Sequence, residues 1–400
     1  MKVAVIGNGV SSVNTASNLR SLDNDIEIDI FTDEHYHYYP RPRLIDLLAD
    51  KVILEEIFFY KESWYEEHNI NVHLNSPVKE LRPEEKEISL FNGERIKYDF
   101  LVLANGAVPS LPPIRGIDKR GVFSIRWLDD VLNLKERVKR SGEVIAIGGG
   151  LLGLEIAAAL QSSGVKTKVI EILPWLLPRQ LDEVGGNLLK KILEDRGLEI
   201  FTGTPTDEIS GDIEVSGVKT RDGRVFKGDT VVITAGIKSS TDLAKNSGLN
   251  VNRGVVVDSF LRTSVENIYA LGDVAEWNGM VYGIIPPALD QAKIVASNIL
   301  GENKEYRGTV PSNILKVAGI DLFSIGTVNP DTLCEVFGYI NEEKNLYKKF
   351  VIKDNKLIGA ILLGDRRDAV HIERVVKTGI DISKFKDYIL DDSFSWKSVT

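Results

Sequence analysis

Apolar residues along the chain gather in short runs, and two of these runs open the same longer pattern. The first pattern reads as strand, turn, helix and strand over residues 2–6, 7–12, 13–19 and 26–31. The second reads in the same order over residues 144–147, 148–153, 154–161 and 165–170. Strand, helix and strand in this order form a βαβ unit with a parallel sheet and a right-handed crossover. The chain is therefore predicted to be an α/β protein with two Rossmann-like dinucleotide-binding domains.

A second repeat marks the boundaries of these domains. Residues 98–113 and 228–241 are both apolar strands that run into a turn of alanine and glycine, and they bracket the second βαβ unit. The simplest interpretation is a domain of residues 108–235 inserted into another that covers residues 1–107 and 236–305. A proline-rich stretch at the first boundary suits a hinge, because proline stiffens a connection.

From about residue 306 the pattern changes to short strands, which predict a small third domain of the α+β class over residues 306–400. Two of its strands are predicted to form a hairpin that turns at Asn355 and Lys356, and a helix is expected over about 371–378. Before this domain, proline in a first turn and periodic apolar positions predict a helix over about 287–300. The last ten residues give no clear prediction.

Composition narrows the function classes. The 400 residues are 43% hydrophobic and 27% charged, as in soluble globular proteins. The net charge of −9 argues against broad nucleic-acid binding, and no apolar run reaches the length of a membrane span. We expect a cytoplasmic protein whose first residues are a mature strand rather than a signal segment. The single cysteine, Cys334, cannot form an internal disulfide, and it is expected to lie buried in a strand of the third domain.

The turns after the two leading strands match the glycine pattern of dinucleotide-binding loops. The matching positions are Gly7, Gly9 and Ser12 in the first loop and Gly148, Gly150 and Gly153 in the second. The first glycine permits the turn, the second lets the backbone approach a pyrophosphate, and the third lets helix and strand pack closely. The helix that follows presents free N–H groups and a partial positive charge to that anion.

An acidic residue near the end of the second strand of each unit could accept hydrogen bonds from a ribose. Asp33, with Glu34 beside it, takes this place in the first unit, and Glu171 takes it in the second. The alternative for both is a solvated acid at a strand end. A carboxylate at position 171 would repel a 2′-phosphate, so we expect NADH rather than NADPH. His35 and His37 lack further ligands nearby, so we expect no metal site.

Two dinucleotide sites favour two dinucleotides, a flavin and a nicotinamide, because hydride passes readily between their rings. At this point the chain resembles the FAD-dependent pyridine-nucleotide oxidoreductases of the glutathione-reductase type. The similar segments are “GNGVSS”, “GGGLLGLE”, “LVLANGAVP” (asparagine in place of the usual threonine), “YALGDVAEW” and “YYPRPRL”. By this resemblance Glu155 belongs to the NADH site, and Asp273 beside Gly272 contacts the ribityl chain of FAD. Arg41 would lie near the flavin, and Val78 would offer backbone contacts to the adenine.

Within that family the chain is most similar to NADH:rubredoxin reductases and to the flavin-binding part of assimilatory nitrite reductases. Residues 38–51, where relatives carry redox cysteines, contain none, so turnover through a thiol is disfavoured. No side chain is predicted as a general acid or base. The reduced flavin is expected to lie at the N-terminus of the helix near Pro287.

The expected function is transfer of hydride from NADH to FAD and of electrons to a small carrier protein of the rubredoxin or ferredoxin type. Two alternatives stay open. One is an NADH oxidase that uses oxygen or a small molecule. The other is an NADH-responsive redox-sensing binding protein. A homo-oligomer is compatible with each of them.

Overall fold

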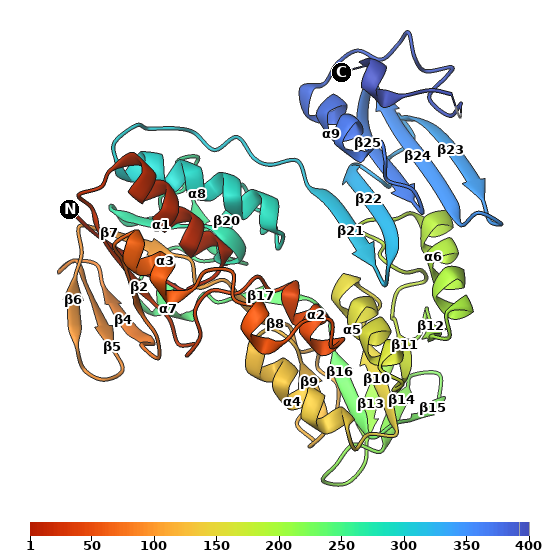
Figure 1. Ribbon diagram of the computed structural model, residues 1–400, viewed down its shortest axis with the longest axis horizontal. Helices are drawn as coiled ribbons and strands as arrows, with labels where there is room; N and C mark the ends of the chain where they lie inside the picture. Colours follow the sequence, from red (N-terminus) through yellow and green to blue (C-terminus); the bar gives the residue numbers. More distant parts are fainter. Residues whose placement is uncertain (392, 400) are drawn as a thin grey trace. The chain divides into compact units, whose positions relative to one another are not determined.

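The computed structural model describes residues 1–391 and 393–399, apart from the side chains of residues 314 and 315. The chain divides into two compact units (Figure 1). Unit 1 contains residues 1–47, 52–110 and 237–309, and unit 2 contains residues 48–51, 111–236 and those from 310 onward. Each unit contains one five-stranded parallel sheet of Rossmann type, which confirms the predicted fold class.

Unit 1 is built on a parallel sheet with the strand order β3-β2-β1-β7-β19. These strands are β1 (Lys2–Ile6), β2 (Glu27–Phe31), β3 (Ile70–His73), β7 (Phe100–Leu103) and β19 (Ile268–Ala270). Helices α1 (Val10–Leu22) and α8 (Ile285–Ile299) pack against each other and bury their apolar residues in the core of this sheet. The chain runs from β1 to β2 on one side and later returns to β7 on the other. Ligands of open α/β sheets bind at such a reversal of strand order.

Unit 2 repeats this order in the sheet β12-β11-β10-β16-β9. Its elements are β9 (Val122–Ser124), α4 (Leu128–Val138), β10 (Glu143–Ile147), α5 (Leu151–Ser162), β11 (Lys166–Ile170), α6 (Glu183–Asp195), β12 (Glu199–Phe201) and β16 (Thr230–Ile233). The predicted strands and helices of both βαβ units are thus confirmed, with ends that differ by at most three residues.

Each unit also contains a small antiparallel sheet of three strands, which the sequence pattern did not reveal. The strands are β4 (Val78–Arg82), β5 (Glu87–Leu90) and β6 (Arg95–Lys97) in unit 1, and β13 (Thr206–Ser210), β14 (Gly217–Thr220) and β15 (Val225–Lys227) in unit 2. The short elements that complete unit 1 are α2 (Arg43–Leu48, whose last residue belongs to unit 2), η1 (Leu54–Glu56), α3 (Glu62–Glu67), α7 (Asp242–Asn246), β18 (Val255–Val257), η2 (Gly272–Val274) and β20 (Ala275–Trp277).

The two alanine and glycine turns found in the sequence lead into strands that pair with each other. Strands β8 (Ala107–Pro109) and β17 (Ile237–Ser239) form an antiparallel ladder in which Pro109 lies opposite Ile237. The polypeptide therefore leaves unit 1 and returns to it at neighbouring points.

The C-terminal part of unit 2 is an antiparallel sheet with the order β21-β22-β25-β24-β23. Its elements are β21 (Ser312–Val317), β22 (Ile320–Gly326), β23 (Glu335–Asn341), β24 (Leu346–Lys353), β25 (Lys356–Leu363), α9 (Ala369–Thr378) and η3 (Trp396–Val399). One face shares a hydrophobic core with α6, and the other packs against α9 and the buried Trp396. Phe394, Trp396 and Val399, for which no element was predicted, thus help to fill this core.

Two local predictions in this sheet are wrong. The β24–β25 hairpin turns at Asp354 and Asn355, both with positive φ, and Lys356 already belongs to the strand. Cys334 precedes β23 and is only half-buried, because this edge strand has no neighbour to cover its outer side.

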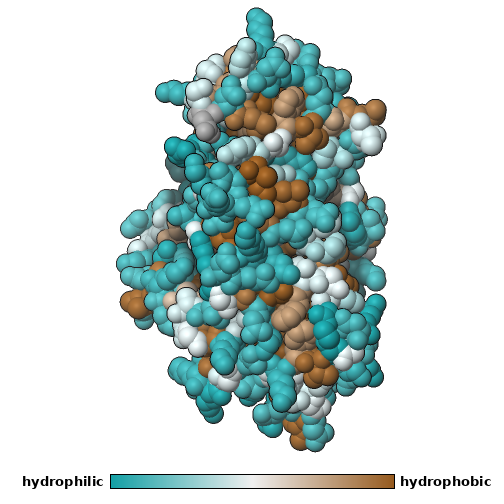
Figure 2. All heavy atoms as spheres, turned by 90° about the vertical axis from the view of Figure 1, so that its right-hand side faces the viewer, coloured by the Kyte–Doolittle hydropathy of each residue, from teal (hydrophilic) through white to brown (hydrophobic). Residues whose placement is uncertain are grey.

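The surface carries its apolar residues in separate groups (Figure 2). On the edge strand β23 the side chains of Val336 and Ile340 are exposed, as is Leu333 just before this strand. Over residues 1–391 and 393–399, no helix combines the length and the apolar composition required to cross a membrane.

Candidate functional site

The first glycine loop joins β1 to α1 at the point where the strand order of unit 1 reverses. Gly7 has a φ of +100°, and a Cβ on it would lie 2.5 Å from the carbonyl oxygen of Ala104 at the end of β7. Gly9 is the N-cap of α1, and a Cβ there would meet nothing within 4 Å. Ser12 is fully buried in the first turn. The loop thus packs tightly on the sheet and leaves open space at the start of the helix.

The second glycine loop has the same construction in unit 2. Gly148 has a φ of +118°, and its Cβ would lie 2.7 Å from the carbonyl oxygen of Thr234 at the end of β16. Gly150 is the N-cap of α5 and faces open space. A Cβ on Gly153 would collide with the carbonyl oxygen of Gly148 and would lie 2.6 Å from the hydroxyl of Thr234.

The two loops differ where the helix packs on the neighbouring strand. Unit 2 has Thr234 on the strand and Gly153 on the helix, whereas unit 1 has Ala104 on the strand and Ser12 on the helix. The Thr234 hydroxyl donates to the carbonyl oxygens of Ile147 and Gly148 at 3.2 and 3.1 Å. The Ser12 hydroxyl, in contrast, is buried without a hydrogen-bond partner among the described residues. The smaller Ala104 stands on the strand where unit 2 has Thr234, which is consistent with a serine in place of the third glycine.

The strand-end acid of unit 2 supports its loop directly. Glu171 is 6% exposed, so it is not the solvated residue that the sequence left open as an alternative. Its carboxylate accepts the N–H of Gly149 at 2.5 Å and the N–H of Leu173 at 2.7 Å. Ionised carboxylates can accept about four hydrogen bonds, so this group keeps capacity for ribose hydroxyls. Glu155 is half-buried in the second turn of α5.

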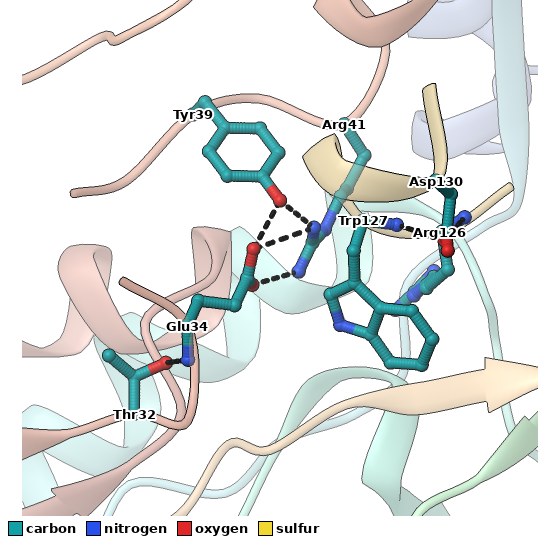
Figure 3. Close-up of polar contacts among 7 residues, drawn as sticks. All are labelled: Thr32, Glu34, Tyr39, Arg41, Arg126, Trp127 and Asp130. Atoms are coloured by element: carbon teal, nitrogen blue, oxygen red, sulfur yellow. Dashed lines mark hydrogen bonds and ion pairs between the residues drawn. The ribbon is translucent and has the colours of Figure 1, made fainter. Parts of the chain in front are cut away.

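The acids after β2 have a different arrangement. Asp33 is exposed, while Glu34 accepts hydrogen bonds from the hydroxyl of Tyr39 and pairs with Arg41 at 2.7 Å (Figure 3). The Arg41 guanidinium also lies 4.8 Å from the centre of the Tyr39 ring. Burial lowers the pKa of Arg41, but Tyr39 and Glu34 raise it further, so the group stays charged. Val78 is the first residue of β4, an edge strand of the three-stranded sheet of unit 1, and it lies opposite Leu90 of β5.

A third segment completes the site of unit 1. Gly272 follows β19 with a φ of +74°, and its N–H donates to the Gln291 side chain on α8 at 2.7 Å. A Cβ on Gly272 would collide with the Ser11 hydroxyl on α1. The carbonyl oxygen of the next residue, Asp273, accepts the Ser239 hydroxyl at 2.6 Å. Gly272 of η2 therefore lies against α1, through Ser11, and against the first half of α8, through Ala288 and Gln291.

Both loops fit a dinucleotide by the same test. Neither α1 nor α5 has a side-chain N-cap or an acidic residue in its first turn. The N–H groups of a first turn need partners, and a phosphate satisfies them while the helix dipole favours its charge. Open space at Gly9 and at Gly150 leaves room for the backbone to approach such a group.

The structure groups the predicted residues by unit. In unit 1, Gly272 and Asp273 lie beside the helix that follows the first loop. In unit 2, Glu171 bonds the second loop, and Glu155 lies on the helix that follows it. Sequence reasoning missed the contacts of Gln291 with η2 and of Glu34 with Arg41. A glutamine inside an apolar helix, such as Gln291 at 1% exposure, was the available signal for the first of these.

Comparison with known proteins gives consistent findings. The family described as “Pyridine nucleotide-disulphide oxidoreductase” matches residues 1–292, and “Rubredoxin NAD+ reductase C-terminal domain” matches residues 311–380. The chain is 36% identical over 386 residues to a nitrite reductase [NAD(P)H] of Bacillus subtilis, covering 96% of this chain and 48% of that protein. It is 32% identical over 388 residues to the NADH-rubredoxin oxidoreductase of Clostridium acetobutylicum, covering 97% and 96%. The chain thus spans about half the length of the nitrite reductase relative and nearly all of the oxidoreductase.

A similar solved structure is the ferredoxin reductase of a cytochrome system from Rhodopseudomonas palustris. It superposes with a TM-score of 0.91 at 25% identity and covers 99% of both chains. The likeness extends over both parallel sheets and the C-terminal antiparallel sheet.

Proposed function

The chain belongs to the pyridine nucleotide-disulphide oxidoreductase family, and we propose that it uses NADH to reduce a bound FAD and passes the electrons to a small carrier protein. The observation that carries this proposal is the pair of similar glycine loops, each at the reversal point of its own parallel sheet. When bound, the flavin supplies the hydride acceptor and can release electrons singly.

In this proposal unit 1 holds FAD. The N-terminus of α1 faces the pyrophosphate, and Gly7 and Gly9 allow its close approach. Asp273 is placed by Gly272, whose N–H is fixed by Gln291. Asp33, exposed after β2, is available to a ribose hydroxyl. The resemblance assigns Arg41 to the flavin side, and its ion pair with Glu34 limits the net charge there.

Unit 2 holds NADH in the same way, with Gly148, Gly150 and Gly153 under the phosphates and Glu155 toward the nicotinamide. Glu171 supports the preference for NADH. Its carboxylate is fixed by two backbone N–H groups, so it cannot easily turn away from a 2′-phosphate. The residues after it, Ile172 and Leu173, are exposed and apolar and offer no positive charge to such a phosphate.

Anaerobic reduction tests the nucleotide preference. The flavin absorbance of the holoenzyme should bleach faster, and at lower concentration, with NADH than with NADPH. Glu171→Gln should lower the ratio of the NADH to the NADPH reduction efficiency by about tenfold or more, since it removes a negative charge that repels the 2′-phosphate of NADPH. Glu199→Gln, an exposed acid on β12, is the matched control and should leave it unchanged. Equal reduction of the wild type by both nucleotides would contradict the assignment of Glu171.

The acceptor is proposed from the cysteine content and the relatives. The sequence contains one cysteine, so no redox-active disulfide can form within a chain. A C-terminal domain of the rubredoxin reductase type and a relative named NADH-rubredoxin oxidoreductase favour a small iron–sulfur carrier. Reoxidation of the reduced protein by rubredoxin, ferredoxin and oxygen should show saturable preference for a carrier. Rapid oxygen use with no carrier preference would instead make the protein an NADH oxidase. Slow turnover with every acceptor, together with NADH-dependent partner binding, would favour a sensor.

A further inference from the structure

The first glycine loop contains buried polar atoms that the second loop lacks. Asn8 lies between Gly7 and Gly9, and its side-chain Nδ2 and Oδ1 are both buried without a hydrogen-bond partner among the described residues. At the equivalent place the second loop has Gly149. A side chain there would be crowded, because a Cβ on Gly149 would lie 2.8 Å from the Leu176 side chain and 3.0 Å from the Glu171 side chain.

A buried carboxamide without partners is unusual, because desolvation of its donor and acceptor is costly unless something pairs with them. The Tyr65 phenol faces the Asn8 side chain. Burial raises the pKa of Tyr65 to about 12, and an interaction with the Asn8 amide acts in the opposite direction and lowers it. Tyr65 Oη already accepts the N–H of Tyr38 at 3.3 Å. Among the described residues, neither polar atom of the Asn8 side chain has a hydrogen-bond partner within 3.5 Å, so this contact with Tyr65 leaves the amide unsatisfied.

The remaining candidate partner is the ligand of the loop itself. Asn8 directly precedes the N-cap of α1, where no side chain caps the helix and the first turn has no acid. A helix N-terminus of this kind attracts an anion. An amide N–H beside it adds a directional donor, and hydrogen bonds to charged acceptors are about twice as strong as neutral ones.

We propose that the Asn8 carboxamide donates a hydrogen bond from Nδ2 to a phosphate oxygen of FAD, and that this contact makes the first loop tighter for its dinucleotide than the second. The inference rests on the proposed function. It assigns Asn8 as a positioning residue for FAD and gives Gly149 no such role. It also explains why the two loops are expected to differ in affinity, since FAD stays bound during turnover while the nicotinamide nucleotide must exchange.

Apoprotein prepared by removal of the flavin provides the test. Titration with FAD, followed by quenching of flavin fluorescence, gives the dissociation constant. Asn8→Leu keeps the approximate shape and removes both polar atoms, so it should raise this constant by about tenfold to a hundredfold. The same change should leave the melting temperature of the apoprotein unchanged or higher, because it removes an unsatisfied group.

Asn8→Asp separates donation to a phosphate from other roles. It places a carboxylate beside the phosphate, so it should weaken FAD binding more than Asn8→Leu does. Asn18→Ala, on the helix α1 that follows the loop, is the matched control, because the Asn18 amide already donates to the Asn14 carbonyl oxygen at 2.7 Å. It should bind FAD like the wild type. Calorimetric titration should give one NADH affinity for all four proteins.

The outcomes separate this inference from the proposed function. Wild-type affinity in Asn8→Leu, or FAD binding by Asn8→Asp as tight as in the wild type, would overturn the role of Asn8 alone. A marked loss of apoprotein stability in Asn8→Leu would also overturn it, because the fold itself would then use the amide. Failure of the wild-type apoprotein to bind FAD would overturn the proposed function, and the inference with it.

Discussion

Replacing Lys349 by methionine should loosen the attachment of α6 to the C-terminal sheet. Lys349 on β24 donates from Nζ to Asp182 Oδ2 at 2.7 Å, and Tyr347 donates to the same oxygen at 2.7 Å. Asp182 is the N-cap of α6 and accepts the N–H of Gly185 at 3.0 Å. One carboxylate therefore both begins the helix and ties it to the sheet.

The magnitude follows from the burial of the pair. The side chains of Lys349 and Asp182 are 9% and 15% exposed. Breaking a fully buried pair by removal of one partner costs about 3–5 kcal/mol. Because Tyr347 and Gly185 would still bond the carboxylate, we expect a cost of about 2–3 kcal/mol for Lys349→Met, in the local stability of α6. Burial would raise the pKa of Asp182, but Lys349 and Tyr347 outweigh it and lower that pKa. The contribution is therefore present at neutral pH and is lost in acid, below the ordinary pKa of an aspartate.

Amide hydrogen exchange is the suitable assay, because a chain with two units need not unfold in one step. Peptides from α6 and β24 should exchange about 30- to 160-fold faster in Lys349→Met, and peptides from unit 1 should not change. The control is Lys191→Met. Lys191 on α6 pairs with Glu342 across the same boundary at 2.7 Å, but both side chains are more than half exposed. Because an exposed ion pair contributes little to stability, Lys191→Met should leave the exchange of both peptides close to that of the wild type.

A double-mutant cycle completes this test. Asp182→Asn keeps a hydrogen-bond acceptor for the helix cap and removes the charge. The double variant Asp182→Asn/Lys349→Met should therefore lose less local stability of α6 than the two single variants lose together. Unchanged exchange in Lys349→Met, or costs that simply add, would show that the ion pair does not stabilise this boundary.

Three further changes have definite expected outcomes. Gly153→Ser should destabilise unit 2 by about 1–3 kcal/mol through overpacking, and Thr234→Ala should recover part of that loss. Thermal denaturation of the double variant measures this, and no recovery would show that the Thr234 hydroxyl is not what crowds a side chain at position 153. Burial would raise the pKa of Asp29, but its hydrogen bonds from His73 and Lys2 lower it to about 2, from 3.8. The free energies of unfolding of the wild type and Asp29→Asn, measured by urea denaturation, should therefore differ by about 1–2 kcal/mol above pH 5, and the difference should vanish as the pH falls from 4 toward 2. Trp396→Ala should cost about 3–5 kcal/mol in the C-terminal core, and calorimetry showing a shift as small as for a surface residue would refute its packing role.

The sequence was informative where one segment alone determines the structure. The glycine loops and their flanking strands and helices were found because Gly7 and Gly148 must adopt positive φ beside a neighbouring strand, and this need is visible in the pattern. Helix α8 was found within two residues because its proline and apolar spacing are local signals.

Features that depend on contacts between distant segments were not visible. The three-stranded sheets have short strands with many exposed residues, so their alternation is weak. The burial of Glu171 requires the backbone of Gly149 as its partner, and the ion pair of Glu34 requires Arg41 after a turn. Cys334 was expected to be buried from its type alone, but the edge position of β23 leaves it partly accessible.

The ladder between β8 and β17 has a consequence for biosynthesis. Strand β19 and helix α8, which complete the sheet and core of unit 1, follow the intervening 111–236 segment in the chain. A ribosome therefore releases the second glycine loop with its whole parallel sheet before the segment around Gly272, which packs against α1 beside the first loop, has been made. Cofactor binding at the first glycine loop should accordingly occur late in translation or after it. Until β19 has been synthesised, β7 remains an unpaired edge strand of the nascent N-terminal segment.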